Sequence, residues 1–136
     1  HAPNPPFSAV QKVNTNYMTT HIELYPMLLQ NKSWISHIRA METSINGLKC
    51  YYIPKASLTD NKLLRQTIHN GDIIAIITSL KGLDTSHIGI AVWHKDGLHM
   101  LNASSIHHKV VEEPKLLRTY MLKHPSQLGI RIARPL

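Results

Sequence analysis

The feature that most constrains the fold is a series of short apolar runs that begins after Gly71. The runs read "DIIAIITS", "SHIGIAVW", "LHMLNAS" and "KVVEE", and residues such as Gly, Asp and Ser separate them. Runs of this length, rich in Ile and Val and bounded by turn-forming residues, are typical of β-strands. The closing "LGIRIARPL" predicts one more strand, in which Ile130 and Ile132 share a face. We therefore expect a mostly antiparallel sheet over residues 71–136.

In the first third of the chain the apolar residues are spaced differently, and the change in pattern falls near Ile53-Pro54. In "NKSWISHIRAMETSING" the apolar residues recur at helical spacing. This pattern predicts a helix that the side chain of Asn31 or Ser33 caps and that Gly47 ends. A shorter helix is expected over residues 22–29, after an irregular "HAPNPPF" opening.

Two further helices and one further strand complete the expected α+β class. "LTDNKLLRQTI" predicts a short helix capped by Thr59 or Asp60, and "EPKLLRTYMLKH" predicts a late helix with Pro114 near its first turn. "LKCYYIP" predicts a strand. The expected architecture is an antiparallel sheet with a helical N-terminal region (residues 1–53), a sheet region (residues 71–136) and one late helix.

Composition narrows the class of protein. With 136 residues, 43% hydrophobic and 17% charged, the chain fits one folded domain and not a disordered segment. No apolar run approaches the roughly 20 residues that a membrane span needs. The formal charge of +7 favours an anionic partner, but the basic residues are scattered and form no stripe with aromatics. No signal peptide is recognisable, and the start at His1 suggests a processed or truncated end.

The main catalytic candidate lies in "SHIGIAVWHKDGLHMLNASS", which is expected to form a hairpin. A four-residue loop over 93–96 places His87 directly opposite Asn102. A tight Asp96-Gly97 turn is the stronger local signal, and it pairs Asn102 with Ala91 instead. Both registers keep the two side chains on one face of the sheet, because side chains alternate along a strand. Only the first register lets them touch.

Contact between these two side chains would prepare His87 for general-base catalysis. An amide oxygen that accepts one ring N–H of His87 fixes the tautomer, so the other ring nitrogen can act as a general base. Gly89 has no side chain and is expected to leave room on the same face. The alternative is a half-buried histidine whose ring bonds a backbone carbonyl, and spacing alone favours that alternative.

The remaining candidates are more readily structural. Asp72 is expected to close the entry turn of its strand, and His21 to cap a helix. Asp84 and Ser86 either support His87 or lie on a loop surface. Cys50, the single cysteine, lies in a strand-like run without the helix start or cation that activates a thiol. A cluster of histidines lacks the spacing of a familiar zinc site, so no metal is expected; its members are His94, His99, His107 and His108.

These segments, in order, resemble a known family. "GDIIAIITSLKGLDTSHIGIAVWHKDGLHMLNASS", "KVVEEP" and "GIRIARPL", with "NYMTTHIELYP", "ISHIRAMETSIN" and "YYIPK" upstream, resemble the C-terminal half of the N-acetylmuramoyl-L-alanine amidase-like family. That family belongs to the NlpC-type, papain-like cysteine hydrolases. The resemblance implies that His87 is catalytic and that Asn102, where many relatives carry histidine, orients its ring. Ser86, Ser104 and Ser105 are the substrate-binding candidates, although a turn role fits them equally, and no cofactor or metal is implied.

The sequence departs from the family pattern at the nucleophilic cysteine. In the family the cysteine lies upstream, at the start of a helix packed on the sheet, and no residue here matches it. Cys50 falls in the "YYIPK" region, on the wrong kind of element. We therefore expect residues 1–136 to be a single domain, the C-terminal portion of a longer hydrolase and inactive alone. Either the missing N-terminal portion or a homodimer partner should cover an apolar sheet face.

The resemblance also implies a reaction and a compartment. It implies cleavage of the amide between N-acetylmuramic acid and L-alanine in peptidoglycan fragments, in the periplasm or outside a bacterial cell. A non-catalytic cell-wall-binding domain of the same fold is the alternative. A nucleic-acid-binding domain is a third and weaker possibility, because its only support is the positive charge.

Overall fold

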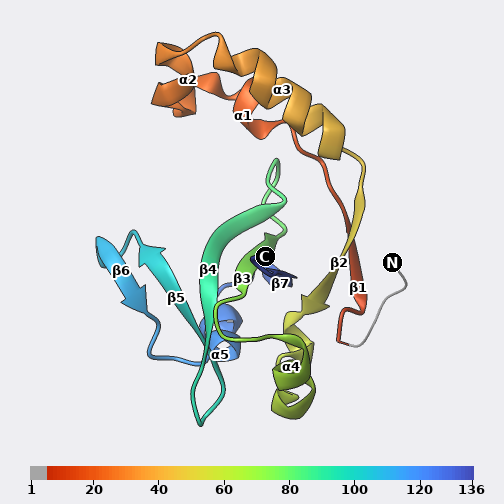
Figure 1. Ribbon diagram of the computed structural model, residues 1–136, viewed down its shortest axis with the longest axis vertical. Coiled ribbons are helices and arrows are strands. Elements are labelled where there is room, and N and C mark those ends of the chain that lie inside the picture. The colour runs from red at the N-terminus through yellow and green to blue at the C-terminus, as the bar shows by residue number, and fades with distance from the viewer. Residues whose placement is uncertain (1–5) are drawn as a thin grey trace.

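The computed structural model describes residues 6–136, which form a helical arm and a sheet body (Figure 1). The arm is a two-stranded ribbon with short helices at its far end. Its elements are β1 (Ala9–Lys12), α1 (Tyr17–Thr20), η1 (Ile22–Leu24), α2 (Pro26–Gln30), α3 (Trp34–Ile45) and β2 (Lys49–Pro54). The elements of the body are η2 (Lys55–Ser57), α4 (Asn61–Thr67), β3 (Ile73–Thr78), β4 (Thr85–Trp93), β5 (Leu98–Ser104), β6 (Lys109–Glu112), α5 (Leu117–Leu122) and β7 (Gln127–Ala133).

The seven strands of residues 6–136 form one antiparallel sheet in the order β1-β2-β7-β3-β4-β5-β6. The strand β3 is central in the body, where Ile76 pairs with His87 on one side and with Ile130 on the other. The strand β2 pairs with β7 through Ile53 and Pro54, so the ribbon of the arm continues into the body. The expected α+β class with an antiparallel sheet is confirmed.

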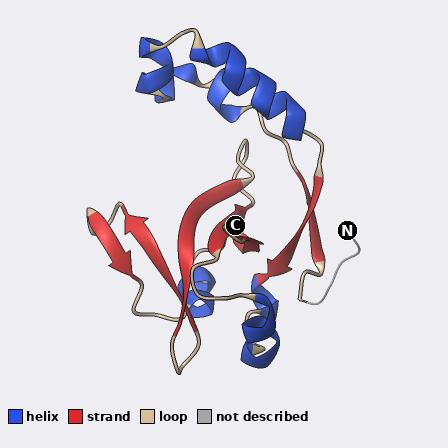
Figure 2. Ribbon diagram, in the orientation of Figure 1, coloured by secondary structure: helices blue, strands red, loops and turns tan. Residues whose placement is uncertain are grey.

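One face of this sheet holds the hydrophobic core. We call it the inner face; α4 and α5 contribute Leu64 and Met121 to the same buried cluster (Figure 2). Side chains alternate along β3, so Ile74 is fully buried there while its neighbour Ile73 is 36% exposed on the other side. Burying an aliphatic side chain of this size contributes about 1.5–3 kcal/mol. The body is therefore held together mainly by apolar burial on its inner face.

The opposite face of β3 to β6, the outer face, is apolar and open. Ile88 is 61% exposed, Ile90 41% and Val110 67%. Adjacent exposed aliphatic side chains of this kind usually mark a surface that packs against more protein. The expectation of an uncovered apolar sheet face therefore matches the exposure in the described chain.

The helices of the arm bury much less apolar surface. Leu28 is their fully buried aliphatic residue, whereas Trp34 and Met41 on α3 are each about half exposed. The main internal link is polar: the buried carboxylate of Glu42 accepts hydrogen bonds from the Met18 amide at 3.0 Å and the Thr19 hydroxyl at 2.5 Å. Helices this short are not stable alone in water, so these contacts are needed to hold the arm together.

Most of the predicted elements are present. The helix expected from the "WISHIRAMETSI" pattern is α3, and the helix after Asp60 is α4, whose Leu63 amide donates to the Asp60 carboxylate at 3.0 Å. The strand predictions correspond to β2 to β7. Ile130 is fully buried and Ile132 packs partly against the same core, as expected for one face.

Three local predictions are wrong. The helix expected over 22–29 is split into η1 and α2, because Pro26 lacks the amide hydrogen that a continuous helix needs. The late helix begins at Leu117, so Pro114 lies before it. Ser33 is the N-cap residue of α3, but no side chain caps that helix.

The strand β1, which pairs with β2 from Ala9 to Lys12, was not predicted. Its "AVQK" sequence is short and follows a Pro-rich opening, so it carries no strand pattern of its own. The opening "HAPNPPF" is expected to be irregular; its residues 1–5 lie outside the described residues, and Pro6 and Phe7 form no regular element.

Candidate functional site

The hairpin of β4 and β5 has a register that differs from both expected ones. Ala91 pairs with Met100 and Trp93 with Leu98, and His94 and Gly97 exchange backbone hydrogen bonds around a two-residue Lys95-Asp96 turn. Both predicted registers are therefore wrong, because the turn lies between the two expected loops. Gly97 closes it with a φ of +144°, a conformation that favours glycine.

This register brings the predicted pair together diagonally. Extending it places Asn102 beside Gly89, two residues along β4 from His87 on the same face, and the longer side chains bridge the remaining offset. The His87 Nε2 lies 2.9 Å from the Asn102 Oδ1. An amide oxygen can only accept, so the Nε2 donates its proton in this contact; in the neutral ring the Nδ1 then holds the lone pair.

The free nitrogen of this imidazole is accessible. The Nδ1 of His87 has no hydrogen-bond partner within residues 6–136 and is not among their buried unsatisfied atoms. His87 pairs with Ile76, a core residue, and thus points to the inner face at the edge of the core. The arrangement can chemically hold an oriented neutral imidazole with one nitrogen ready to accept a proton.

The space expected over Gly89 is not open. A Cβ placed on Gly89 would lie 2.3 Å from the Cγ of Met100 and 2.9 Å from the Leu101 carbonyl oxygen. Met100 is fully buried and fills this position beside the dyad of His87 and Asn102. Glycine is required here for close packing, not for access of a nucleophile.

The three serine candidates lie near the two strands but make different contacts. Ser86 is exposed at the irregularity of β4, where pairing to β3 shifts between His87 and Thr85. The Ser104 hydroxyl accepts from the His107 amide at 3.2 Å, which is the turn role considered for it. Ser105 follows β5 and is exposed. Their substrate-binding role stays a prediction.

Cys50 lies on β2 opposite Gln11, half-buried and reduced. It is on a strand, as expected, but it is not part of the hydrophobic core; it lines a cleft that neither His87 nor Asn102 lines. No hydrogen bond connects it to the dyad in the described chain. The structure therefore does not pair the only cysteine with the imidazole.

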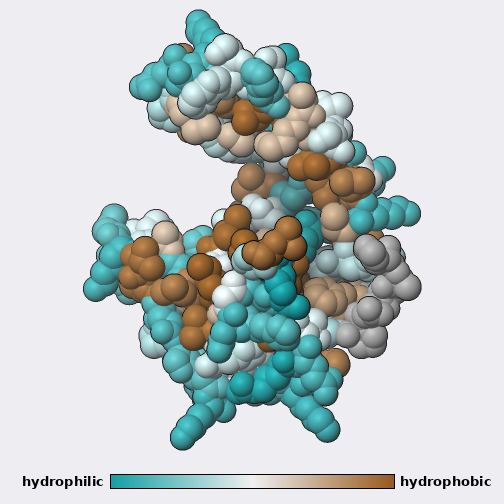
Figure 3. All heavy atoms as spheres, in the orientation of Figure 1, coloured by the Kyte–Doolittle hydropathy of each residue, from teal (hydrophilic) through white to brown (hydrophobic). Residues whose placement is uncertain are grey.

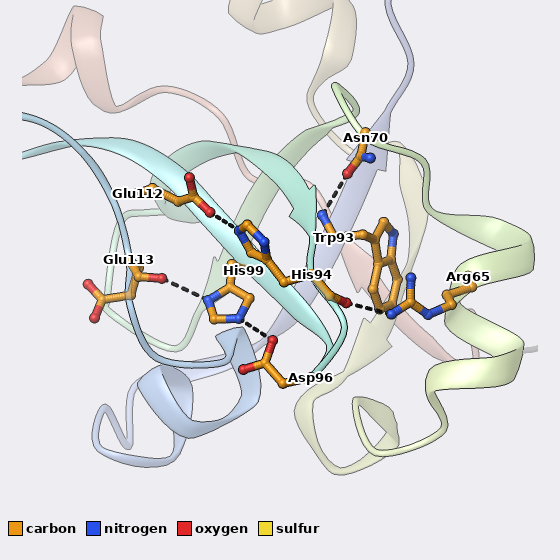
Figure 4. A network of polar contacts seen from close by, with 8 residues as sticks. All are labelled: Arg65, Asn70, Trp93, His94, Asp96, His99, Glu112 and Glu113. Carbon is orange, nitrogen blue, oxygen red and sulfur yellow. Dashed lines mark hydrogen bonds and ion pairs between the residues drawn. The ribbon is translucent and has the colours of Figure 1, made fainter.

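The histidine cluster at the other end of the hairpin forms a structural network (Figure 4). His99 is 5% exposed; its Nδ1 lies 2.9 Å from the Glu113 carbonyl and its Nε2 2.9 Å from the Asp96 carboxylate. Burial alone lowers the pKa of His99, but the hydrogen bonds to these two acceptors outweigh it and raise the pKa above its usual value. His94 contacts the Glu112 carboxylate.

Within residues 6–136, no three His, Cys, Asp or Glu side chains are arranged to hold a metal ion. Beside the network, the Arg65 guanidinium stacks 4.3 Å above the Trp93 ring. His107 and His108 are exposed on the loop before β6 and are not part of the network. His94 and His99 thus hold the hairpin in place.

Two carboxylates considered in the sequence have structural roles. Asp72 closes its turn by accepting from the His69 amide at 2.8 Å, as expected, and it also binds the Arg134 guanidinium through two bonds of 2.7 and 2.8 Å. The bonds from Arg134 hold the pKa of Asp72 below its usual value. No local pattern indicated this pair, because the partners are 62 positions apart.

The second carboxylate, Asp84, links the body to the arm. Its side chain accepts from the Asn14 amide and the Thr15 hydroxyl, each at 3.0 Å. Its backbone carbonyl accepts from the Gln11 amide group at 2.9 Å. His21, by contrast, stays within the arm, where it ends α1 and stacks on Tyr17 at 4.0 Å.

Comparison with known proteins gives a family and several solved structures. Residues 4–130 match the AmiA-like family model, described as N-acetylmuramoyl-L-alanine amidase-like. A Bacteroides fragilis protein described as a candidate xylanase is 38% identical with a TM-score of 0.79, over 94% of this chain and 55% of its own. An N-acetylmuramoyl-L-alanine amidase from Bacteroides uniformis ATCC 8492 is 33% identical with a TM-score of 0.79, over 93% of this chain and 53% of its own.

A more distant structure is a Legionella pneumophila protein of the DUF1460 family, with 27% identity and a TM-score of 0.54, over 91% of this chain and 48% of its own. The chain thus spans about half the length of the solved relatives that it matches. Among curated proteins, none is significantly similar. No helix within residues 6–136 is long and apolar enough to cross a membrane.

Proposed function

Because the chain belongs to the AmiA-like family of N-acetylmuramoyl-L-alanine amidase-like proteins, we propose that it carries the imidazole half of a peptidoglycan amidase. The reaction is cysteine-type hydrolysis of the bond between N-acetylmuramic acid and L-alanine. The observation that carries this proposal is the 2.9 Å contact between the His87 Nε2 and the Asn102 Oδ1. The same contact supports a papain-like, NlpC-type mechanism, in which an amide orients the catalytic histidine.

In this mechanism His87 moves protons and a thiol supplies the covalent bond. The Nδ1 of His87 takes the thiol proton, and the thiolate sulfur attacks the amide carbonyl. The resulting imidazolium returns the proton to the L-alanine nitrogen as the C–N bond breaks. Water then attacks the thioester with His87 as general base, which releases the muramoyl carboxylate and the free thiol. Asn102 keeps the Nε2 proton in place throughout and is a positioning residue.

The thiol comes from polypeptide outside these 136 residues. Cys50 is on β2, away from the dyad, and the solved relatives contain about as much chain again as this one matches. The exposed aliphatic residues of the outer face support packing against further protein, and the inner face beside His87 leaves the Nδ1 accessible. We therefore regard residues 1–136, with a helical region (residues 1–53) and a sheet region (residues 71–136), as the C-terminal portion of the catalytic unit.

The substrate class and location follow from the same proposal. Peptidoglycan fragments carry several carboxylates, and the net charge of +7 favours such anionic partners. We place this activity in the periplasm or outside the cell, where the peptidoglycan lies. The substrate-contact candidates are the three serines that lie close to His87 or Asn102 in the sequence, namely Ser86, Ser104 and Ser105.

A second candidate function is a wall-binding module of the same fold that has lost catalysis. It is favoured by one observation, namely that the only cysteine of the chain does not meet His87. The two functions differ in turnover, and the intact full-length protein is the right material to compare them.

The test is cleavage of defined muropeptides by the full-length protein, followed by mass spectrometry. His87→Ala should lower the rate by about 10²–10⁴-fold, the usual contribution of a general base. Asn102→Ala should lower it less and shift the pH dependence of kcat, because the ring is no longer held in one tautomer. The exposed His107 provides the matched control, and His107→Ala should leave the rate unchanged.

Two results would contradict the hydrolase proposal. The first is cleavage that His87→Ala leaves intact, which would move catalysis elsewhere. The second is tight muropeptide binding without any product, which would favour the binding module. Circular dichroism of each variant separates lost chemistry from lost folding.

A further inference from the structure

A cleft of about 470 Å³ lies where the arm meets the body. Its residues come from both regions of the molecule: Tyr17 and Ile45 from the arm helices, Leu83 from the β3–β4 connection, Thr85 from the start of β4, and Arg131 from β7. In Figure 1 this connection extends from the body toward the arm, and Figure 3 shows hydrophobic residues on the side of the arm that faces the body. The size and the mixed lining are those of a small-ligand site.

Arg131 is the cation of this cleft, and its charge is not neutralised by the described residues. It is half-buried, its Nη2 donates to the neutral Gln11 amide oxygen at 2.6 Å, and its Nε is buried without a partner. Within residues 6–136 it forms no ion pair, whereas Arg134, three positions on, binds Asp72 through two bonds. The buried Nε is shielded from the cleft, but the rest of this half-buried guanidinium carries a positive charge with which an anion in the cleft can pair.

The guanidinium is held in place by a chain of hydrogen bonds. The Gln11 oxygen accepts from Arg131 and its nitrogen donates to the Asp84 carbonyl at 2.9 Å, so turning the amide over would break both bonds. The Asp84 carboxylate is engaged by two neutral donors, Asn14 and Thr15, and not by Arg131. The cleft therefore presents a fixed guanidinium and a carboxylate that still has lone pairs to accept an N–H.

We propose that this cleft binds the carboxylate end of a short peptide. The terminal carboxylate pairs with the N–H groups of the Arg131 guanidinium that are neither buried nor bonded to Gln11. A peptide N–H donates to Asp84, and the adjoining side chain packs on the apolar lining, including Tyr17 and Leu48. Asp84 makes a second carboxylate on the ligand unfavourable. The site does not depend on the proposed hydrolase activity, since neither His87 nor Asn102 lines it.

The experiment is isothermal titration of the full-length protein with N-acetyl-L-alanyl-L-phenylalanine and with its C-terminal amide. The acid should bind at least 10-fold more tightly than the amide, because only the acid pairs with Arg131. Arg131→Gln should remove this preference. Arg118→Gln deletes the same charge from an exposed position on α5 outside the cleft, and it should leave both affinities unchanged.

A second variant keeps the test decisive if Arg131→Gln fails to fold. Leu48 lines the cleft and is 51% exposed, so Leu48→Trp fills the cleft without disturbing the core, and it should weaken acid binding at least 10-fold. The proposal is overturned if acid and amide bind equally, if Leu48→Trp has no effect, or if 10 mM acid gives no heat above that of the buffer blank.

Discussion

The arm and the body of this molecule are stabilised by different forces. The buried cluster of the body, to which the end of β2 adds Ile53, is entirely aliphatic apart from Met100 and Met121. In the helices of the arm, the fully buried aliphatic residue is Leu28, and the other buried side chain is the carboxylate of Glu42. Apolar burial is cumulative and non-directional, whereas a buried carboxylate depends on a few aligned donors.

Because of this contrast, the arm and the body need not unfold together. Local stability follows the density of buried apolar contacts, so the arm helices should open more readily than the sheet. The arm is nevertheless tied to the body by the Asp84 contacts to Asn14 and Thr15 and by the pairing of β2 with β7. The position of the cleft thus depends on these polar bonds together with the short pairing of β2 with β7.

The largest expected effect is a cavity in the body. Ile130→Ala removes a fully buried side chain that packs between β2 and β3, and should lower the free energy of unfolding by about 2–5 kcal/mol. Leu28→Ala, an equal burial in the arm, should instead speed local hydrogen exchange in α1 to α3 and change the global midpoint much less. Urea denaturation with exchange mass spectrometry measures both. Equal losses of global stability in the two variants would mean that arm and body form one cooperative unit.

An effect of intermediate size on stability is expected when the buried carboxylate of the arm is removed. Glu42→Ala leaves the Met18 amide and the Thr19 hydroxyl without their buried acceptor, which costs about 1–3 kcal/mol of local stability. Exchange of the α1 amides should accelerate while β3 and β4 stay protected. Glu23 is exposed in the same arm, and Glu23→Ala should change nothing. Unchanged α1 exchange in Glu42→Ala would show that apolar contacts suffice to hold the arm.

The smallest effect is a pH dependence of the body. Both ring nitrogens of His99 face acceptors, so both bonds exist only in the imidazolium form, which raises its pKa. The stabilisation is therefore complete below the ordinary histidine pKa of 6.5 and is lost as the pH rises through the raised value. His94 borders the ring of His99 and contacts the Glu112 carboxylate, so both groups face the site of titration.

The measurement is urea denaturation between pH 5 and pH 9, combined with NMR titration of the histidine ring protons. His99→Gln should flatten the loss of stability at rising pH, whereas His107→Gln, at an exposed position, should keep it. A stability of the native protein that rises with pH over the same interval would contradict the imidazolium assignment.

Some features of the His87–Asn102 hairpin could be predicted from the sequence and others could not. Alternation along the strands correctly places His87 and Asn102 on one face, and the apolar runs locate β3, β4 and β5. Both predicted registers are wrong, because the turn forms at Lys95-Asp96 and neither as a 93–96 loop nor at Asp96-Gly97. The role of Gly89 also differs from the expected one, since its missing side chain makes room for Met100 and not for a reactant.

Local sequence was sufficient for the strands of the body, for the helix at Trp34–Ile45 and for the shared face of His87 and Asn102, because these depend on neighbours within a few positions. The diagonal His87–Asn102 contact, the pairing of Asp72 with Arg134 and the anchoring of the arm by Asp84 arise only in the folded chain. Each of these contacts joins residues that are far apart in the sequence. Turn geometry and packing bring them together, and no local sequence pattern predicts that.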